Sequence, residues 1–277
     1  MRLFDSRAIT RPLRASALAA GLFTTSCGAH LAKMSKLPAG PGTPATDAAD
    51  VVMQATAVCR NINTITLEMS VHGSAGGHRL RGRLTAGLAT PASVRLEANA
   101  PFGQPIFIFV ADGPGDNAAS LLLPRDRRVL ERGKPADVLE AVSGVPLDAA
   151  ALRTLVTGCA NRPDVSDAVA FGDDWRVVPD GADNVYFHHT STSPAWQLVA
   201  TVRRDGWRAD YSMFQNSLPR VVRLVSQPPG RFDLQLDLSQ VEINVPLGPE
   251  AFRLERTAGA QPISLDELRQ SGPLGEK

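Results

Sequence analysis

Side chains that could carry acid–base or metal chemistry are few in this sequence, and their spacing does not suit that chemistry. His188 and His189 are adjacent in a segment expected to form a strand, where neighbouring residues point to opposite faces and cannot easily share a metal ion. Asp173 and Asp174 precede Trp175 at an expected turn, which favours a solvated pair over a catalytic one. The sequence has no Gly-x-Ser-x-Gly, Walker or His-Glu-x-x-His motif. We therefore predict a protein that is not an enzyme and that holds no metal and no cofactor.

Cysteine chemistry near the N-terminus is more informative. Arginines precede the short apolar segment 15–23, small residues follow it, and Cys27 comes next. This order resembles a bacterial lipoprotein signal, in which the cysteine is acylated and becomes the first residue of the mature chain. An ordinary secretory signal with an incidental cysteine is the alternative. The resemblance implies a signal peptide over residues 1–26, lipidation of Cys27 and a periplasmic location, and Gly28 favours the outer membrane over the inner one.

The two remaining cysteines, Cys59 and Cys159, each lie at the expected end of a helix. Two cysteines in an oxidising periplasm can pair, but their connectivity does not follow from sequence, so a disulfide between them stays open. Their spacing from the histidines does not match a zinc site.

Length and charge limit the remaining classes of protein. The chain has 277 residues, of which 43% are hydrophobic, enough to bury the core of one large domain or two small ones. Its formal net charge of +1 gives no general attraction for nucleic acid, and no nucleic-acid partner is expected. Prolines and glycines predict a flexible tether over residues 27–46. Residues 47–256 are expected to form the folded domain and residues 257–277 a C-terminal tail.

Changes in hydrophobic periodicity predict the elements of the domain. A helical pattern opens at Asp47 and ends near Cys59, and from Asn63 apolar and polar residues alternate as in half-buried strands. The expected strands cover 63–71, 78–88, 93–99, 105–111, 117–123, 127–132, 175–178, 184–187, 196–203, 207–214, 218–227 and 232–245. We predict an α+β fold, an open antiparallel half-barrel of about 11 strands with a helical lid and an N-terminal helix.

The lid is expected where two helical segments interrupt the strands. The first starts near Pro135, the second follows Asp148 as a candidate N-cap, and the hinge between them covers residues 143–147. Phe102 stands between Pro101 and Gly103 at a tight turn; it either folds back onto the sheet or forms an exposed apolar tip. An apolar tip, a sheet and a helical pair over that sheet would suit a protein that handles lipid.

Together these segments resemble the LolB family. The resemblance rests on Ala100-Pro101-Phe102-Gly103 after a strand, on residues 136–147, which end in Gly144-Val145-Pro146-Leu147, and on residues 152–158, which end in Thr157-Gly158. Members of that family are outer-membrane lipoprotein receptors with the open-barrel fold of the periplasmic carrier LolA. The resemblance covers roughly residues 80–158. It implies a monomer that accepts lipoproteins from a LolA-like carrier, holds their acyl chains in a hydrophobic cavity, and uses Phe102 as a membrane-insertion loop.

The lining of that cavity is expected on the lid and on the inner face of the strands. The strand residues carry an ambiguity, because Ile106 and Ile108 share one face and Phe107 and Phe109 share the other. The candidate lining residues are Leu84, Leu96, Ile106, Ile108, Leu122, Val138, Leu139, Val142, Leu152 and Leu155. An ordinary closed core made of the same residues is the alternative. For the function, the alternative is an envelope stress-sensing or structural lipoprotein that binds a protein partner on the same fold.

Overall fold

The structure is a computed structural model that describes residues 31–100, 105–113, 115–116, 118–161, 163–255 and 258–271. These residues belong to one compact unit that begins at Leu31. The expectations for the signal peptide, for Cys27 and for Phe102 fall outside the described residues.

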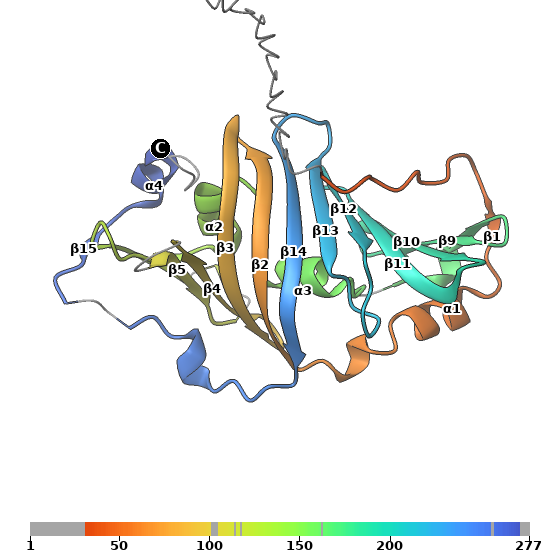
Figure 1. Ribbon diagram of the computed structural model, residues 1–277, viewed down its shortest axis with the longest axis horizontal. Coiled ribbons are helices and arrows are strands. Elements are labelled where there is room, and N and C mark those ends of the chain that lie inside the picture. Colours follow the sequence, from red (N-terminus) through yellow and green to blue (C-terminus); the bar gives the residue numbers. More distant parts are fainter. Residues whose placement is uncertain are drawn as a thin grey trace, which may run out of the picture. The chain divides into compact units, whose positions relative to one another are not determined.

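One sheet organises this unit (Figure 1). Its strands follow the order β1-β8-β9-β10-β11-β12-β13-β14-β2-β3-β4-β5-β6-β7-β15, so most neighbours are also consecutive along the chain. The strands are β1 (Thr43–Pro44), β2 (Thr64–Ala75), β3 (His78–Ala89), β4 (Ser93–Asn99), β5 (Pro105–Ala111), β6 (Ala119–Leu123), β7 (Arg128–Gly133), β8 (Val169–Phe171), β9 (Trp175–Asp180), β10 (Asp183–Thr190), β11 (Ser193–Arg203), β12 (Trp207–Ser212), β13 (Val221–Ser226), β14 (Phe232–Ile243) and β15 (Gln261–Pro262).

The sheet has 15 strands instead of the expected 11 or so. Three of the additions, β1, β8 and β15, are only two or three residues long, and β1 and β15 each contain a proline. Such short pieces carry no alternation that a sequence pattern can detect. The pairing of β15 with β7 is parallel, whereas the other neighbouring strands pair antiparallel, as expected.

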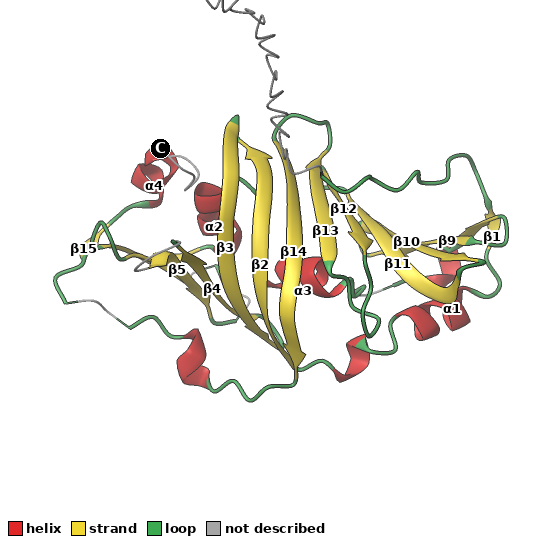
Figure 2. Ribbon diagram, viewed as in Figure 1, coloured by secondary structure: helices red, strands yellow, loops and turns green. Residues whose placement is uncertain are grey.

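Short helices complete the unit (Figure 2). They are α1 (Ala48–Ala55), α2 (Pro135–Ser143), α3 (Ala149–Thr157), α4 (Leu265–Ser271) and the single 3₁₀ turns η1 (Cys59–Asn61), η2 (Val165–Asp167) and η3 (Pro249–Phe252). The N-terminal helix and the helical pair therefore form where the periodicity predicted them.

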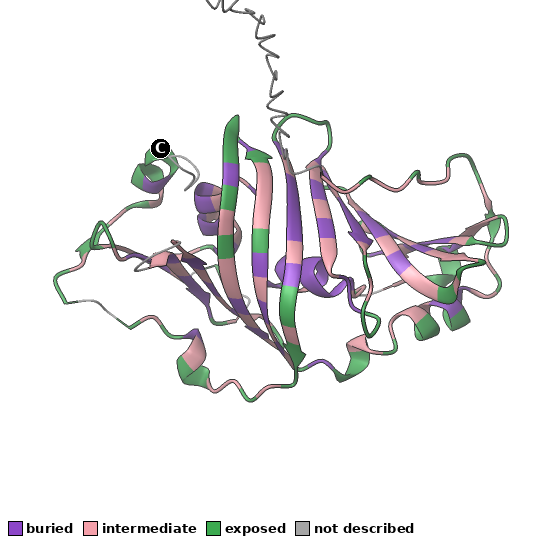
Figure 3. Ribbon diagram, in the orientation of Figure 1, coloured by how far each residue is buried: buried purple, intermediate pink, exposed green. Residues whose placement is uncertain are grey.

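Alternation along the strands separates a core face from an outer face. In β2, Ile65, Leu67 and Met69 are buried, whereas Thr66 and Glu68 between them are only half-buried. The same pattern recurs in β4 and β13, and it appears in Figure 3 as alternating colours along the strands. Helices α2 and α3 add their apolar residues to the same core cluster, so they lie on the core face of the sheet.

Residues 31–46 do not form the free tether that the sequence predicts. The backbone N–H of Ala32 donates to Gln235 Oε1 at 2.5 Å, and Arg223 Nη1 donates to the carbonyl oxygen of Ala32 at 2.6 Å. Further along, Thr43 pairs with Ala170 in the β1–β8 ladder. The prolines and glycines suggested a segment without contacts, but hydrogen bonds to its backbone hold it in place.

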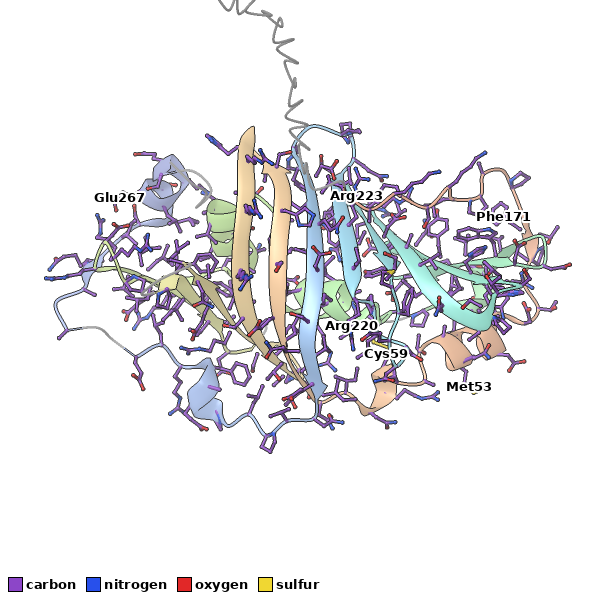
Figure 4. The ribbon with its side chains drawn as sticks, in the orientation of Figure 1. Met53, Cys59, Phe171, Arg220, Arg223 and Glu267 are labelled. Carbon is purple, nitrogen blue, oxygen red and sulfur yellow. A yellow bond between two sulfur atoms is a disulfide. The ribbon has the colours of Figure 1, made fainter. Side chains whose placement is uncertain are left out.

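Ser35 is bound in the same way. Its N–H donates to Asp210 Oδ1 at 2.6 Å, and Arg208 Nη2 donates to its carbonyl oxygen at 2.5 Å. We call the four side chains that bind residues 32–35 the clasp: Arg208 and Asp210 on β12, Arg223 on β13 and Gln235 on β14. These side chains alternate with core residues, so the clasp lies on the outer face (Figure 4 labels Arg223).

The C-terminal tail is also packed, as far as residue 271. Strand β15 pairs with β7, Arg128 Nη2 lies 3.1 Å from Glu267 Oε1, and Leu268 of α4 is fully buried. Helix α4 packs against α2. A tail that was expected beyond the domain therefore contributes to its core.

Candidate functional site

The site with the clearest architecture is the core face of the sheet under α2 and α3. Both helices end at a glycine in the left-handed conformation, Gly144 with φ of 75° and Gly158 with φ of 65°. Glycine adopts this conformation without the steric cost that a Cβ imposes, which makes it a common helix C-cap. Asp148 caps the start of α3, where its carboxylate accepts a hydrogen bond from Ala151 N–H at 2.7 Å. The predicted hinge therefore exists as a break between two separately capped helices.

Eight of the ten expected lining residues lie in or against the core under these helices. Six are between 0 and 4% exposed, and Leu84 and Ile106 are partly buried against the same cluster. These six are Leu96, Val138, Leu139, Val142, Leu152 and Leu155. In this conformation the lid residues fill the space between the helices and the sheet, which corresponds to the closed core that the sequence left as an alternative.

Ile108 and Leu122 lie on the outer face, against the expectation that they line the inner one. The register pairs Phe109 with Leu96 and Ile108 with Glu97, and a pair of directly opposed residues shares a face. Phe109 is therefore the inward residue, and it is fully buried. Both faces of β5 are apolar, so alternation alone could not distinguish them. Ile106 is half-buried and packs against the core cluster.

On the outer face, Ile108 and Leu122 form part of a pocket of about 560 Å³. Its opposite wall is the segment 250–255, which Arg95 Nη1 holds through the carbonyl oxygens of Ala251 and Arg253, both at 3.2 Å. A second pocket of about 380 Å³ lies beside it over β2, β3 and β4, and its lining includes Glu68, Glu97 and Glu242. No residue of α2 or α3 lines either pocket.

Helix α3 is fixed more firmly than α2. A disulfide joins Cys159, just past the end of α3, to Cys59 in η1 (Figure 4), and Arg153 donates a hydrogen bond to the carbonyl oxygen of Ile62. Helix α2 instead packs on β6 and α4 without a covalent link of its own. The two halves of the lid therefore differ in how freely they can leave the sheet.

Polar side chains gather where α3 crosses β11 and β12. Tyr211 OH donates to the carbonyl oxygen of Thr154 at 3.5 Å and lies 3.5 Å from Thr201 Oγ1. Burial raises the pKa of Tyr211 to about 12, so its hydroxyl stays protonated at neutral pH. Arg203 lies over the ring of Trp207 at 4.9 Å from its centroid. These residues make one end of the core face polar.

Arg203 itself is charge-compensated. It forms ion pairs with Asp183 at 3.3 Å and with Asp205 at 2.8 Å. Burial would lower the pKa of Arg203, but the hydrogen bond to Asp205 and the charges of Asp205, Asp183 and Asp148 together raise it. The guanidinium is thus held in its charged form by carboxylates of the protein.

The sequence did not single out Arg203, Thr154, Trp207 or Tyr211, nor any residue of the clasp. One signal could have found two of them: alternation in the expected strand 207–214 places Trp207 and Tyr211 on the same face. That α3 would cross this face is a tertiary contact with no local signature. Within the described residues no cluster of three or more His, Cys, Asp or Glu side chains could hold a metal ion. In the same part of the chain, no helix has the length and apolar character that crossing a bilayer requires.

Comparison with known proteins defines the fold. No protein-family model matches the sequence, and no curated protein matches it significantly. The structure is similar to a LolA superfamily protein from Nitrosomonas europaea, with a TM-score of 0.52 and 11% identity, over 76% of this chain and 99% of that one. A DUF1329 family protein from Desulfovibrio piger matches with a TM-score of 0.45 and 11% identity, over 76% of this chain and 98% of that one. The lipoprotein LppX of Mycobacterium tuberculosis gives 0.32 and 12%, over 73% of this chain and 97% of that one. Only the first score is high enough to indicate a shared fold, which is that of the LolA superfamily.

Proposed function

We propose that this chain, with its LolA-type fold, binds lipid acyl chains on the core face of its sheet after α2 moves aside. The observation that carries the proposal is the pair of short capped helices whose apolar residues cover one face of an open sheet. Each helix is nine residues long. Helices this short have little stability of their own and depend on the surface beneath them. Their displacement would open a continuous apolar groove.

The energetics allow such an exchange. Removing Val138, Leu139 and Val142 from the core exposes apolar area, which is unfavourable by about 25 cal/mol per Å². An acyl chain that enters the same space regains about 0.8 kcal/mol for each CH₂ group that it buries. The two terms offset each other, so the closed and loaded states can lie close in free energy. Lipid can then enter and leave without a covalent step.

Anchoring determines which helix moves. The disulfide at Cys159 and the hydrogen bond from Arg153 hold α3 to the segment 59–62. The end of α2 at Gly144 is followed by the break before α3. Helix α2 is held down by non-covalent contacts, which include its packing on β6 and α4 and a 3.0 Å ion pair between Glu140 and Arg231. We assign the moving part to α2, with residues 144–148 as the hinge.

The more specific proposal follows the LolB resemblance. Lipidation of Cys27 would place the protein on the periplasmic face of the outer membrane. A LolA-like carrier would hand it lipoproteins, and Phe102 would help to insert them into the bilayer. The cargo would be the acyl chains of the incoming lipoprotein.

Native mass spectrometry of the purified protein with a synthetic triacylated lipopeptide tests the lipid-binding proposal. We expect a one-to-one complex, and we expect Leu139→Glu to abolish it because the new carboxylate faces the core. Ala150→Glu adds the same charge at an exposed position of α3 and should bind as the unmodified protein does. Leu139→Ala is a milder change at the same position, for use if Leu139→Glu does not fold. It should retain lipopeptide binding with altered affinity. If no lipopeptide binds to the unmodified protein, the lipid-binding proposal is wrong and a protein-binding lipoprotein becomes the better explanation.

Delivery is tested separately. In a transfer assay from loaded protein to liposomes, Phe102→Asp should bind the lipopeptide normally and release it to the liposomes more slowly. Unchanged transfer by Phe102→Asp would remove the insertion role of this residue and leave lipid binding intact.

A further inference from the structure

Two buried hydrogen-bond donors, one on β12 and one on α3, have no partner among the described residues. Trp207 is 2% exposed and Thr154 is 7% exposed, yet Trp207 Nε1 and Thr154 Oγ1 make no hydrogen bond with any described residue. Unpaired polar atoms of this kind are rare in protein interiors because burying them without a partner is unfavourable. They therefore call for an explanation.

Neighbouring hydroxyls in the lid show that Thr154 is an exception. Thr157 Oγ1 donates to the carbonyl oxygen of Arg153 at 2.7 Å, and Ser143 Oγ donates to that of Leu139 at 2.6 Å. Both therefore use the carbonyl oxygen four residues back, which a helical Ser or Thr hydroxyl commonly binds. Thr154 Oγ1 makes no such bond.

The two other unpaired buried atoms have a simpler explanation. Arg128 Nε and Arg153 Nη1 belong to guanidinium groups whose other nitrogens already donate hydrogen bonds. Arg128 donates to Pro262 and Glu267, and Arg153 donates to Ile62. The Trp207 indole has a single donor, so no second nitrogen can compensate.

Both orphan donors belong to the polar end of the core face. The carbonyl oxygen of Thr154 accepts a hydrogen bond from Tyr211. Trp207, Ala209 and Tyr211 are every second residue of β12 and share its inward face. On β11, Arg203 lies opposite Trp207 and Thr201 opposite Ala209. The donors thus lie along one strand and the helix above it, on the face that the proposed lipid would enter.

The charges at this end exclude an anionic ligand. Arg203 is the nearby cation, and Asp183 and Asp205 already pair with it. The carboxylates of Asp148 and Asp180 also act on Arg203 and Tyr211. A phosphate placed here would meet acidic side chains and no uncompensated cation. The orphan donors need an acceptor without charge.

We propose that Trp207 Nε1 and Thr154 Oγ1 bind the ester carbonyl oxygens of a neutral diacylglyceryl group, while its acyl chains extend under the lid. Such a group has two ester carbonyls, so each donor would have one acceptor. An ester carbonyl is a pure acceptor, as an indole N–H requires. This inference rests on the proposed lipid binding and adds the polar part of the ligand to it.

The test compares lipids that differ only at the linkage or headgroup. The probes are dioleoylglycerol, its dioleyl ether analogue without carbonyl groups, and dioleoyl phosphatidic acid, each titrated into the purified protein. We expect the ester to bind about three- to tenfold more tightly than the ether for each hydrogen bond made. We expect phosphatidic acid to bind no better than the ether.

Variants connect that preference to the two donors. Trp207→Phe keeps an aromatic ring and Thr154→Val keeps the side-chain shape, and each should reduce the ratio of ester affinity to ether affinity. Trp175→Phe is the matched control, because Trp175 stacks on His188 outside the lid, and it should keep the full ratio.

Each outcome is decisive. Equal binding of ester and ether, or a ratio that survives both variants, would overturn the diacylglyceryl site and leave acyl-chain binding intact. Tightest binding of phosphatidic acid would overturn the neutral-ligand assignment. Failure of all three lipids to bind would overturn lipid binding itself and the present inference with it.

Discussion

Loss of the Cys59–Cys159 disulfide should be the most destabilising single chemical change in this protein. The two cysteines are 100 residues apart in sequence, so the bond closes a loop that spans the first half of the sheet and both lid helices. In the chain-entropy treatment, a loop of about 100 residues restricts the unfolded state by about 4.7 kcal/mol. That is a large share of the roughly 5–15 kcal/mol by which native domains are stable.

Urea unfolding of the oxidised protein and of the Cys59→Ser/Cys159→Ser variant measures this contribution. We expect the free energy of unfolding to fall by about 3–5 kcal/mol. The dependence on urea should become steeper, because the unfolded chain without the cross-link exposes more surface. A reducing agent should shift the unmodified protein to the behaviour of the variant and leave the variant itself unchanged.

The native fold should survive the change, because Arg153 and the buried residues Leu152 and Leu155 also hold α3 in place. The far-ultraviolet spectrum of the variant should therefore match that of the parent in the absence of urea. A loss of stability below about 1 kcal/mol would refute the reasoning, since it would mean that the unfolded chain gains little freedom from the broken loop.

Three further predictions concern the lid, the tail and the clasp. Asp148→Ala should lower the free energy of unfolding by about 1 kcal/mol through loss of the α3 cap, and Asp148→Asn should restore most of it in urea titrations. Hydrogen bonds from the Ser264 N–H and hydroxyl, and then from Arg128, hold the pKa of Glu267 below its ordinary 4.5. The ionised Glu267 carboxylate therefore stabilises the docking of α4 fully above pH 4.5, and this stabilisation is lost as pH falls through the lower pKa of the folded state. Amide exchange in residues 265–271 should become faster over that range, and Glu267→Gln should abolish the pH dependence. Arg223→Ala should free residues 31–36 to rapid amide exchange and proteolysis, whereas Arg220→Ala on the neighbouring surface should not, and equal protection in both variants would argue against the clasp.

Local sequence patterns were sufficient to predict most strands and helices. They were insufficient to predict which face of each strand points inward and which short strands complete the sheet. Alternation through Ile65, Leu67 and Met69 identified β2 and its core face correctly, because one side of that strand is polar. In β5, Ile108 and Phe109 are both apolar, so only the register with β4 shows that Phe109 faces the core. Where one face of a strand packs on the core and the other lines an outer pocket, both faces are apolar. Hydropathy alone then cannot tell which face points inward.

The lid was predictable, but the polar end beneath it was not. Asp148, Gly144 and Gly158 have the local signatures of caps, and these indicated two helices and the break between them. The meeting of Thr154 with Tyr211 joins residues 57 positions apart and depends on how α3 crosses β12. The clasp is similar, since Ala32 and Gln235 are 203 positions apart. Contacts at such separations follow from the complete fold and not from any window of sequence.

The clasp would have a mechanical consequence under the proposed lipidation of Cys27. Five residue steps separate Cys27 from Ala32, which is a contour length of at most about 17 Å. Release of residues 32–35 would move the first fixed residue to Thr43 in the β1–β8 ladder, and this contour length would grow to about 55 Å. Making or breaking the four hydrogen bonds between the clasp and residues 32–35 would thus set the length of free chain between the proposed anchor and the folded unit.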